Sequence, residues 1–353
     1  MTVFSNRTLA ITAGVCAALL ATGNLLLANT LLMPSGNNSF AHIACGIAVT
    51  AATFLLGNKR LLKAAPYLMA TLLILLLLCP VFGSSINGSF RYLRVGAFSF
   101  TPALLSLPVL SLFWAYIADK TPENISRKSW IILIAATLIT AGLIFIEPFV
   151  SMAGFVIIFG LIMFTLAGCG IRKVLLAATA VIIIAASTVP LAIKNNPLQM
   201  QKNFYTHLFS PDYTTQYHTW SVLTTLKHSV FCGHHQVPAT PKYHIPNAVT
   251  DSALIAGCGE FGYIFLIGAL LSAAVLIACG AVLTRRSKTH AERLLTGGMT
   301  TVIALPALFN TLMMTGLLPM GGVAFPFLAY SGTAMLACAS ALGCILSNGK
   351  KNA

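Results

Sequence analysis

Acidic residues are scarce in this chain, and two of them stand out by their position. The sequence has only seven Asp and Glu among 353 residues. Asp251 and Glu260 lie in HIPNAVTDSALIAGCGEFG (244–262), where a polar loop meets a long apolar run. A carboxylate is costly to keep in such a place, so it is by default a candidate functional group. Asp251 suits a general base, although Asp at the start of a helix is also a common cap.

Two arginines form a second candidate group. Arg91 and Arg94 lie among aromatic residues and glycines in SINGSFRYLRVGAFSFTP (85–102). Arginine suits the bidentate recognition of phosphate. The alternative is that both side chains snorkel to a membrane interface that the aromatic rings line. The spacing alone favours neither reading.

A metal site built by the protein is not expected. Cys232, His234 and His235, with His228 nearby, do not have the spacing of a recognised site, and real sites need three or four convergent ligands. The nine cysteines show no paired zinc-type spacing and no disulfide framework.

The composition places these groups in a membrane protein. Hydrophobic residues make up 57% of the chain and charged residues 8%, and the mean hydropathy is +0.87. A soluble globule would carry about 25% charged residues, so the solvent of this chain is lipid. The net charge of +14 does not indicate nucleic acid, because the basic residues form short clusters between apolar runs.

About ten runs are long enough to cross a bilayer as helices, at roughly 20 residues each. The sequence therefore predicts an all-α polytopic fold. The runs are approximately 8–33, 40–57, 65–84, 101–118, 129–146, 149–168, 173–193, 251–284, 295–316 and 324–347.

Basic residues orient the chain, because cytoplasmic loops carry an excess of Lys and Arg. With both termini in the cytoplasm, only six of the 21 basic residues fall outside. Those six are Arg91, Arg94, Lys194, Lys202, Lys227 and Lys242. The same orientation makes 194–250 a large external loop between the seventh and eighth spans. We expect one integral membrane domain over 1–353, without an internal repeat.

Three stretches together resemble one family of bacterial membrane proteins, the shape, elongation, division and sporulation family of RodA, FtsW and SpoVE. GSFRYLRVGAFSFTP (88–102) is similar to the family signature that opens G-x-x-R-W and closes on Q-P. TDSALIAGCGEFGYIF (250–265) is similar to H-T-D-F followed by E-E-x-G. NTLMMTGLLPMGGVAFPFLAYSGTAML (310–336) is similar to the most specific segment, which opens on Asn and contains L-P and S-Y-G-G. The resemblance covers essentially the whole chain.

This resemblance implies a peptidoglycan glycosyltransferase of the bacterial cytoplasmic (inner) membrane. Members of the family polymerise lipid II on the outer face and work with a class B penicillin-binding protein. The family's proposed catalytic aspartate falls on Asp251 and its signature arginine on Arg91. Arg94 and Lys242 are further candidate cations for the pyrophosphate leaving group, and Lys242 fits an ordinary loop charge equally well. Glu260 is expected to bind substrate as a cavity-lining residue, or to be a buried residue that hydrogen-bonds or forms an ion pair. A divalent cation that bridges Asp251 and the pyrophosphate stays open.

Several family residues are replaced here. Val249 stands where the family has the His before T-D, and Gly259 where it has the first Glu of E-E. Two other classes of function therefore stay open. One is a flippase for lipid-linked precursors, and the other is a non-catalytic membrane scaffold for a penicillin-binding protein.

Overall fold

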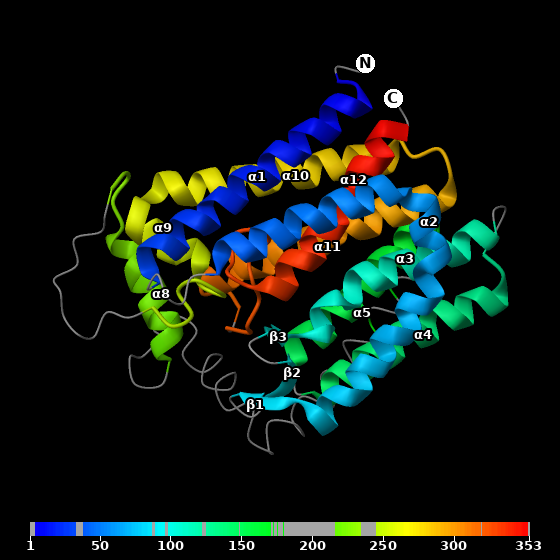
Figure 1. Cartoon of the computed structure of the whole chain (residues 1–353), viewed down its shortest axis with the longest axis horizontal. Helices are drawn as coiled ribbons and strands as arrows, with labels where there is room; N and C mark the ends of the chain where they lie inside the picture. Colours follow the sequence, from blue (N-terminus) through cyan, green and yellow to red (C-terminus); the bar gives the residue numbers. More distant parts are fainter. Residues whose placement is uncertain are drawn as a thin grey trace.

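The structure is a computed structural model that describes residues 4–32, 38–86, 89–95, 98–121, 125–147, 149–170, 172, 175, 179, 216–233, 245–318 and 320–351. Helices dominate this part of the chain and pack side by side (Figure 1). They are α1 (Asn6–Leu31), α2 (Ser39–Phe82), the 3-10 helix η2 (Pro102–Leu105), α3 (Ser106–Lys120), α4 (Arg127–Ile146), α5 (Val150–Leu166), α8 (Tyr217–His228), α9 (Ala253–Phe261), α10 (Tyr263–Arg285), α11 (His290–Met314) and α12 (Gly332–Lys351). Nearly all of the predicted span 173–193 and more than half of the predicted loop 194–250 lie outside the described residues.

Seven helical segments of the described part are long and apolar enough to cross a membrane. They are α1, α2, η2 with α3, α4, α10, α11 and α12, and α5 is a shorter apolar helix. The polytopic helical fold is therefore confirmed, while the count of ten spans and the place of the external loop stay predictions.

The second and third predicted spans form one element, α2, without a loop between them. Its 44 residues are interrupted at Gly57, where the backbone leaves the helical region at φ 71° and ψ 155°. Glycine adopts a positive φ without steric cost, and the chain changes direction within α2 (Figure 1). Asn58 is buried next to this break and donates from Nδ2 to the Cys344 carbonyl of α12 at 3.4 Å.

The eighth predicted span, 251–284, is two helices rather than one. Gly262 separates α9 from α10 with φ 86° and ψ −179°, a conformation that side chains disfavour. The segment at 230–233 hydrogen-bonds across the break. Tyr263 and Ile264 donate their amides to the Val230 and Phe231 carbonyls at 2.9 and 3.0 Å. These partners replace the bonds that a continuous helix would make.

The prediction of an all-α fold is wrong for residues 84–100. Three short antiparallel strands form there: β1 (Ser84–Ile86), β2 (Ser89–Val95) and β3 (Phe98–Phe100). β2 is the central strand and pairs with both neighbours. Its sequence, SFRYLRV, is rich in aromatic and branched residues, which suit a pleated surface. The strands pack against α2 and η2, so the first family-like stretch is a small folded unit.

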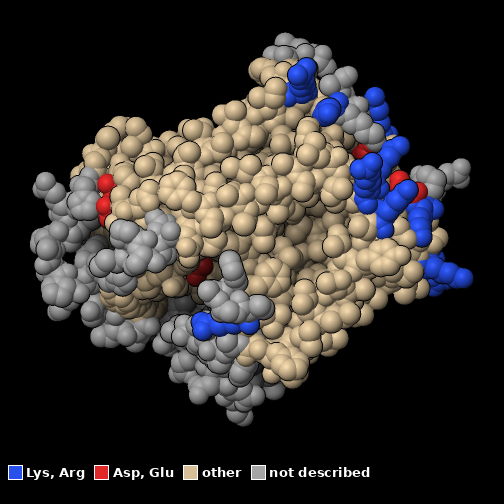
Figure 2. Space-filling model, viewed as in Figure 1, with Lys and Arg blue, Asp and Glu red and all other residues tan. Residues whose placement is uncertain are grey.

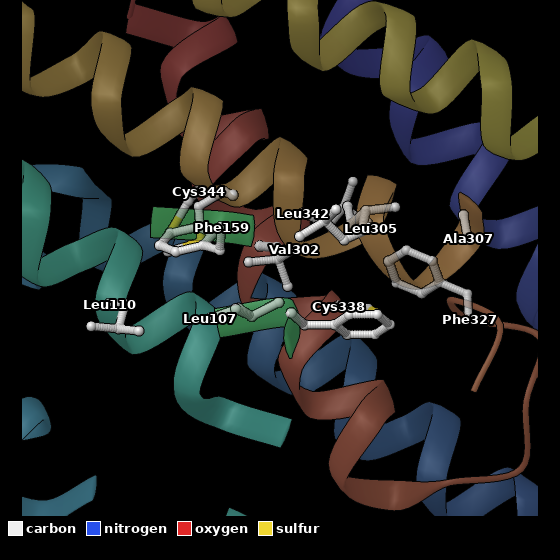
Figure 3. Packing of buried hydrophobic residues seen from close by; sticks show 14 of the residues in the cluster. Leu107, Leu110, Phe159, Val302, Leu305, Ala307, Phe327, Cys338, Leu342 and Cys344 are labelled. Carbon is white, nitrogen blue, oxygen red and sulfur yellow. The ribbon is translucent and has the colours of Figure 1, made fainter. Parts of the chain in front are cut away.

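Helix α11 lies at the centre of the packing, against α3, α5, α10 and α12. Two adjacent glycines allow the close approach. A Cβ on Gly297 would lie 2.6 Å from Leu166 of α5, and one on Gly298 would lie 2.7 Å from Ser111 of α3. Small residues of this kind let membrane helices pack backbone to backbone. Figure 3 shows the apolar side chains that meet there, which include Leu107, Leu110, Phe159, Val302, Leu305, Ala307, Phe327, Cys338, Leu342 and Cys344.

Basic residues gather at the end of the molecule where the two termini lie (Figure 2). The start of α1, the bend of α2, the end of α3, the start of α4, the α10–α11 connection and the end of α12 lie at this end (Figure 1). Arg286 ties two of them together, because its guanidinium donates to the Phe4 carbonyl at 2.8 Å and to Asn6 Oδ1 at 2.9 Å. Among the side chains that the structure describes, the basic ones are therefore concentrated at one end of the folded chain.

Substitution of Gly262 by Ala is expected to destabilise the fold by about 1–3 kcal/mol or more, from backbone strain alone. The new Cβ would also lie 2.7 Å from the Val230 and Phe231 carbonyl oxygens. Thermal unfolding of the purified chain in detergent measures the effect. Gly268→Ala is the matched control, because Gly268 lies in α10 with nothing within 4 Å of an added Cβ. Equal melting temperatures for the two variants would contradict the account of the break.

Candidate active site

Asp251 lies in a tight turn, residues 246–252, that leads into α9. The turn forms around Asn247, which has a positive φ of 55° that asparagine tolerates better than most residues. The Thr250 and Ser252 amides donate to the Asn247 carbonyl at 3.0 and 3.1 Å. The Asn247 side-chain amide also lies 3.4 Å from Asp251 Oδ2. Asp251 itself is half-buried, so its carboxylate is accessible from outside the bundle.

The side chain of Asn310, in the apolar helix α11, hydrogen-bonds to the backbone of this turn. It is fully buried, and its Nδ2 donates to the Asp251 carbonyl at 2.7 Å and to the Val323 carbonyl at 2.6 Å. One side chain thus fixes the backbone of two separate segments. The sequence analysis quoted Asn310 as the first residue of a family-like stretch and gave it no role. An amide inside an apolar helix was the signal, because such a group needs partners.

The segment between α11 and α12, residues 320–331, closes the other side of the turn. The Tyr330 amide donates to the Val249 carbonyl at 2.7 Å. Asn24 of α1 donates from Nδ2 to the Ala329 carbonyl at 2.8 Å, and Ser151 of α5 donates to the Gly321 carbonyl at 2.6 Å. Irregular backbone at membrane depth needs such internal partners. The segment is therefore more than a tight turn between two helices, because its backbone is hydrogen-bonded to α1, to α5 and to the Asp251 turn.

The first family-like stretch joins the same network through α12. The Thr101 amide, just after β3, donates to Thr333 Oγ1 at 3.2 Å. Thr333 lies in the first turn of α12, three residues after Tyr330. The third stretch thus contacts both of the others: Asn310 and Tyr330 bond to the turn that carries Asp251, and Thr333 bonds to Thr101.

The structure separates Glu260 from Asp251. Glu260 lies in the last turn of α9, whereas Asp251 precedes the first, and the rise of a helix puts about 13 Å between them. Helix α8 packs closely on this part of α9, because a Cβ on Gly259 would lie 3.1 Å from Thr225 Cγ2. The glycine at this position, where the family has Glu, makes room for α8.

The predicted cations are only partly described. Arg94 is exposed on β2 and pairs across the sheet with Ser99. Arg91 lies on β2 by its backbone, but its side chain is outside the described residues, as is the whole of Lys242. In the described part of the chain, no three His, Cys, Asp or Glu side chains gather as metal ligands do.

Replacement of Asn310 by Leu is expected to destabilise the protein by roughly 2–5 kcal/mol, because two buried carbonyls lose their donor. Thermal unfolding in detergent checks this. Thr311→Val is the control, since the Thr311 hydroxyl bonds only to the Ala307 carbonyl within α11, at 2.7 Å. An Asn310→Leu variant as stable as Thr311→Val would mean that Asn310 does not hold the turn.

Solved structures show the same fold. The chain superimposes on a component of a peptidoglycan synthase complex, described as coordinating polymerization and crosslinking, with a TM-score of 0.77 and 20% identity over 100% of this chain and 99% of that one. The rod shape determining protein RodA of Thermus thermophilus matches with a TM-score of 0.69 and 17% identity, over 99% and 98% of the two chains.

Sequence relatives point to the same group. The probable peptidoglycan glycosyltransferase FtsW of Taylorella equigenitalis is 26% identical over 316 residues, 86% of this chain and 84% of that protein. The peptidoglycan glycosyltransferase MrdB of Escherichia coli is 24% identical over 288 residues, 80% of this chain and 77% of its own. The family profile for FtsW, RodA and SpoVE, described as "Cell cycle protein", matches residues 15–352. The chain belongs to the FtsW, RodA and SpoVE family.

Proposed function

We propose that Asp251 is the general base of this chain, a peptidoglycan glycosyltransferase, and that lipid II is its substrate. The observation that carries the proposal is that a half-buried carboxylate lies in a turn whose backbone is held by the third family-like stretch, 310–336. Asn310 from the bundle and Tyr330 from the 320–331 segment both hold the backbone of its turn. That amount of support is more than a helix cap needs.

The reaction asks for a base in such a place. The 4-hydroxyl of one GlcNAc attacks the anomeric carbon of the next sugar, and the lipid pyrophosphate leaves. A carboxylate within hydrogen-bond reach accepts the hydroxyl proton as the new bond forms. Asp251 is reachable from outside the bundle while its backbone is fixed, so it meets both needs.

Positive charge is needed near the pyrophosphate leaving group, and electrostatic stabilisation of this group is expected to lower the reaction barrier more than the general base does. We assign this task to Arg91 first, then to Arg94 and Lys242. The exposed position of Arg94 on a small sheet, joined to α12 through Thr101 and Thr333, supports its assignment. Glu260, a helix length from Asp251, fits a cavity-lining role better than contact with the same atom. A divalent cation on the pyrophosphate stays an open part of the proposal.

A class B penicillin-binding protein is the proposed partner. One structural neighbour comes from a peptidoglycan synthase complex that coordinates polymerization and crosslinking. The proposal assigns only polymerisation to this chain, so a partner would supply the crosslinking activity. Membrane lipid surrounds the apolar helices. The proposed place is the bacterial cytoplasmic membrane, with both termini in the cytoplasm and the Asp251 turn outside.

Substitution of Asp251 by Asn is expected to lower lipid II polymerisation at least about 100-fold, because the base is lost. The assay uses the purified complex with its penicillin-binding protein and resolves glycan strands on a gel. Asp119→Asn is the control, since Asp119 undergoes the same chemical change on the exposed end of α3.

Each outcome of this assay separates the three classes of function. Strands from wild type and Asp119→Asn alone support the base. Equal strands from Asp251→Asn would remove Asp251 from the chemistry. An intact complex that makes no strands in any form would favour the scaffold, or the flippase if labelled lipid II then crosses vesicle membranes.

The proposed orientation predicts that Cys232 reacts with a membrane-impermeant maleimide from outside. Cys232 is exposed in the 231–233 segment, on the same side as the Asp251 turn in this orientation. The test uses spheroplasts and a variant whose only cysteine is Cys232. A second variant, whose only cysteine is introduced by Lys288→Cys, is the matched site in the basic α10–α11 connection. It should react only after the membrane is permeabilised, and the reverse pattern would invert the topology.

A further inference from the structure

A histidine on α8 reaches the residue next to Asp251. His218 lies in the first turn of α8, and its Nε2 is 2.8 Å from Ser252 Oγ. Ser252 is fully buried and follows Asp251 directly. Helix α8 itself packs against α9, so the contact belongs to a helix–helix interface.

The direction of this hydrogen bond follows from the other bond of the serine. Ser252 Oγ donates its single proton to the Pro246 carbonyl at 2.9 Å. A hydroxyl has one proton and two lone pairs, so Nε2 must be the donor to Ser252 Oγ. Burial lowers the pKa of His218, which favours the neutral imidazole at neutral pH. The hydrogen bond to Ser252 then selects the tautomer that carries its proton on Nε2.

Ser252, the last residue of the turn, hydrogen-bonds back to the first two residues of the turn. Its hydroxyl bonds to Pro246, at the start of the turn, and its amide bonds to the Asn247 carbonyl at 3.1 Å. His218 bonds to the same hydroxyl and so anchors the turn to α8. Asp251 lies between these anchored points, and a shift of the turn would move its carboxylate.

This arrangement stands where the chain departs from the family pattern. That pattern has His at the position of Val249 and Phe at the position of Ser252. Here the Val249 carbonyl accepts from the Tyr330 amide, and no imidazole stands directly before Thr250. The family pattern has no hydroxyl at the position of Ser252, and here that hydroxyl accepts a hydrogen bond from the His218 imidazole of α8.

We propose that His218 is a positioning residue, which acts through Ser252 to hold the Asp251 turn in its working geometry. The inference rests on the proposed function of Asp251. It makes the external helix α8 a structural part of the site. A contact from α8 also gives the loop that carries it a direct way to affect the base.

The test measures kcat and KM for lipid II polymerisation by the full complex. His218→Leu is expected to lower kcat about 10–100-fold with KM changed less than about twofold, since a small misplacement of a reacting group has an effect of this size. His218→Gln keeps an N–H donor of similar reach and is expected to recover most of kcat. His228→Leu is the control, because His228 is an exposed histidine at the other end of α8, where its Nδ1 lies 3.0 Å from the Thr224 carbonyl oxygen of the same helix.

A double-mutant cycle with Ser252→Ala isolates the pair. His218→Leu should have little further effect once the hydroxyl is gone, because the two residues act as one unit. Additive losses, an equal loss in His218→Gln, or a change in KM alone would overturn the positioning role. Asp251→Asn is assayed beside these variants. If Asp251→Asn stays active, the proposed function fails; if it is inactive while His218→Leu behaves as wild type, only this inference fails.

A readout without activity completes the test. The Thr250 and Ser252 amides, bonded to the Asn247 carbonyl, should resist hydrogen exchange in the wild-type complex. Their exchange should become faster in His218→Leu and stay unchanged in His228→Leu and His218→Gln. Unchanged exchange in His218→Leu would refute the anchoring of the turn, whatever the polymerisation assay gives.

Discussion

The paired hydrogen bonds of Asn310 are the constraint on which the rest of the site depends. A single amide inside an apolar helix donates to the Asp251 and Val323 carbonyls, 2.7 and 2.6 Å away. Both carbonyls belong to non-helical backbone packed against this buried side chain, and a buried carbonyl left without a donor would be costly. The hydrogen bonds of Tyr330, Asn24 and Ser252 further stabilise the two segments that Asn310 links, the Asp251 turn and residues 320–331.

Two departures from the family pattern, Gly259 and Ser252, are explained by the packing of α8 against α9. Gly259 replaces a Glu where Thr225 of α8 comes within 3.1 Å of an added Cβ. Ser252 replaces a Phe, and α8 contributes His218 at 2.8 Å from its hydroxyl. Both changes lie on the face of α9 that meets α8. They fit one local repacking of α8 against α9, and they leave the Asp251 turn and Asn310 in place.

The sequence predicted the parts of the fold that depend on long apolar runs and on charge. Helical spans and the basic end of the bundle followed from hydropathy and from the positions of Lys and Arg. The breaks at Gly57 and Gly262 did not, because a glycine inside an apolar run has the same hydropathy whether the helix continues or turns. The strands at 84–100 were not predicted, because the stretch 85–102 was considered only for phosphate recognition or for side chains that snorkel among aromatic rings.

The site was predicted in part for the same reason. Asp251 was found because acids are rare in this chain and because its surroundings resemble a family motif. Asn310 and His218 act through contacts with residues 59 and 34 positions away along the chain. No local pattern reports such contacts, so only the folded structure could reveal them. Glu260 lies in the last turn of α9, and its separation from Asp251 and its role stay predictions from helix geometry.

A structure of the full complex with bound lipid II, trapped in the Asp251→Asn variant, tests the central claim most directly. If Asp251 is the base, the 4-hydroxyl of the acceptor sugar will lie within about 2.6–3.2 Å of the side chain at position 251. The pyrophosphate of the donor will then face the small sheet that carries Arg91 and Arg94. An acceptor hydroxyl bound beside a different carboxylate, with position 251 facing away, would contradict the assignment.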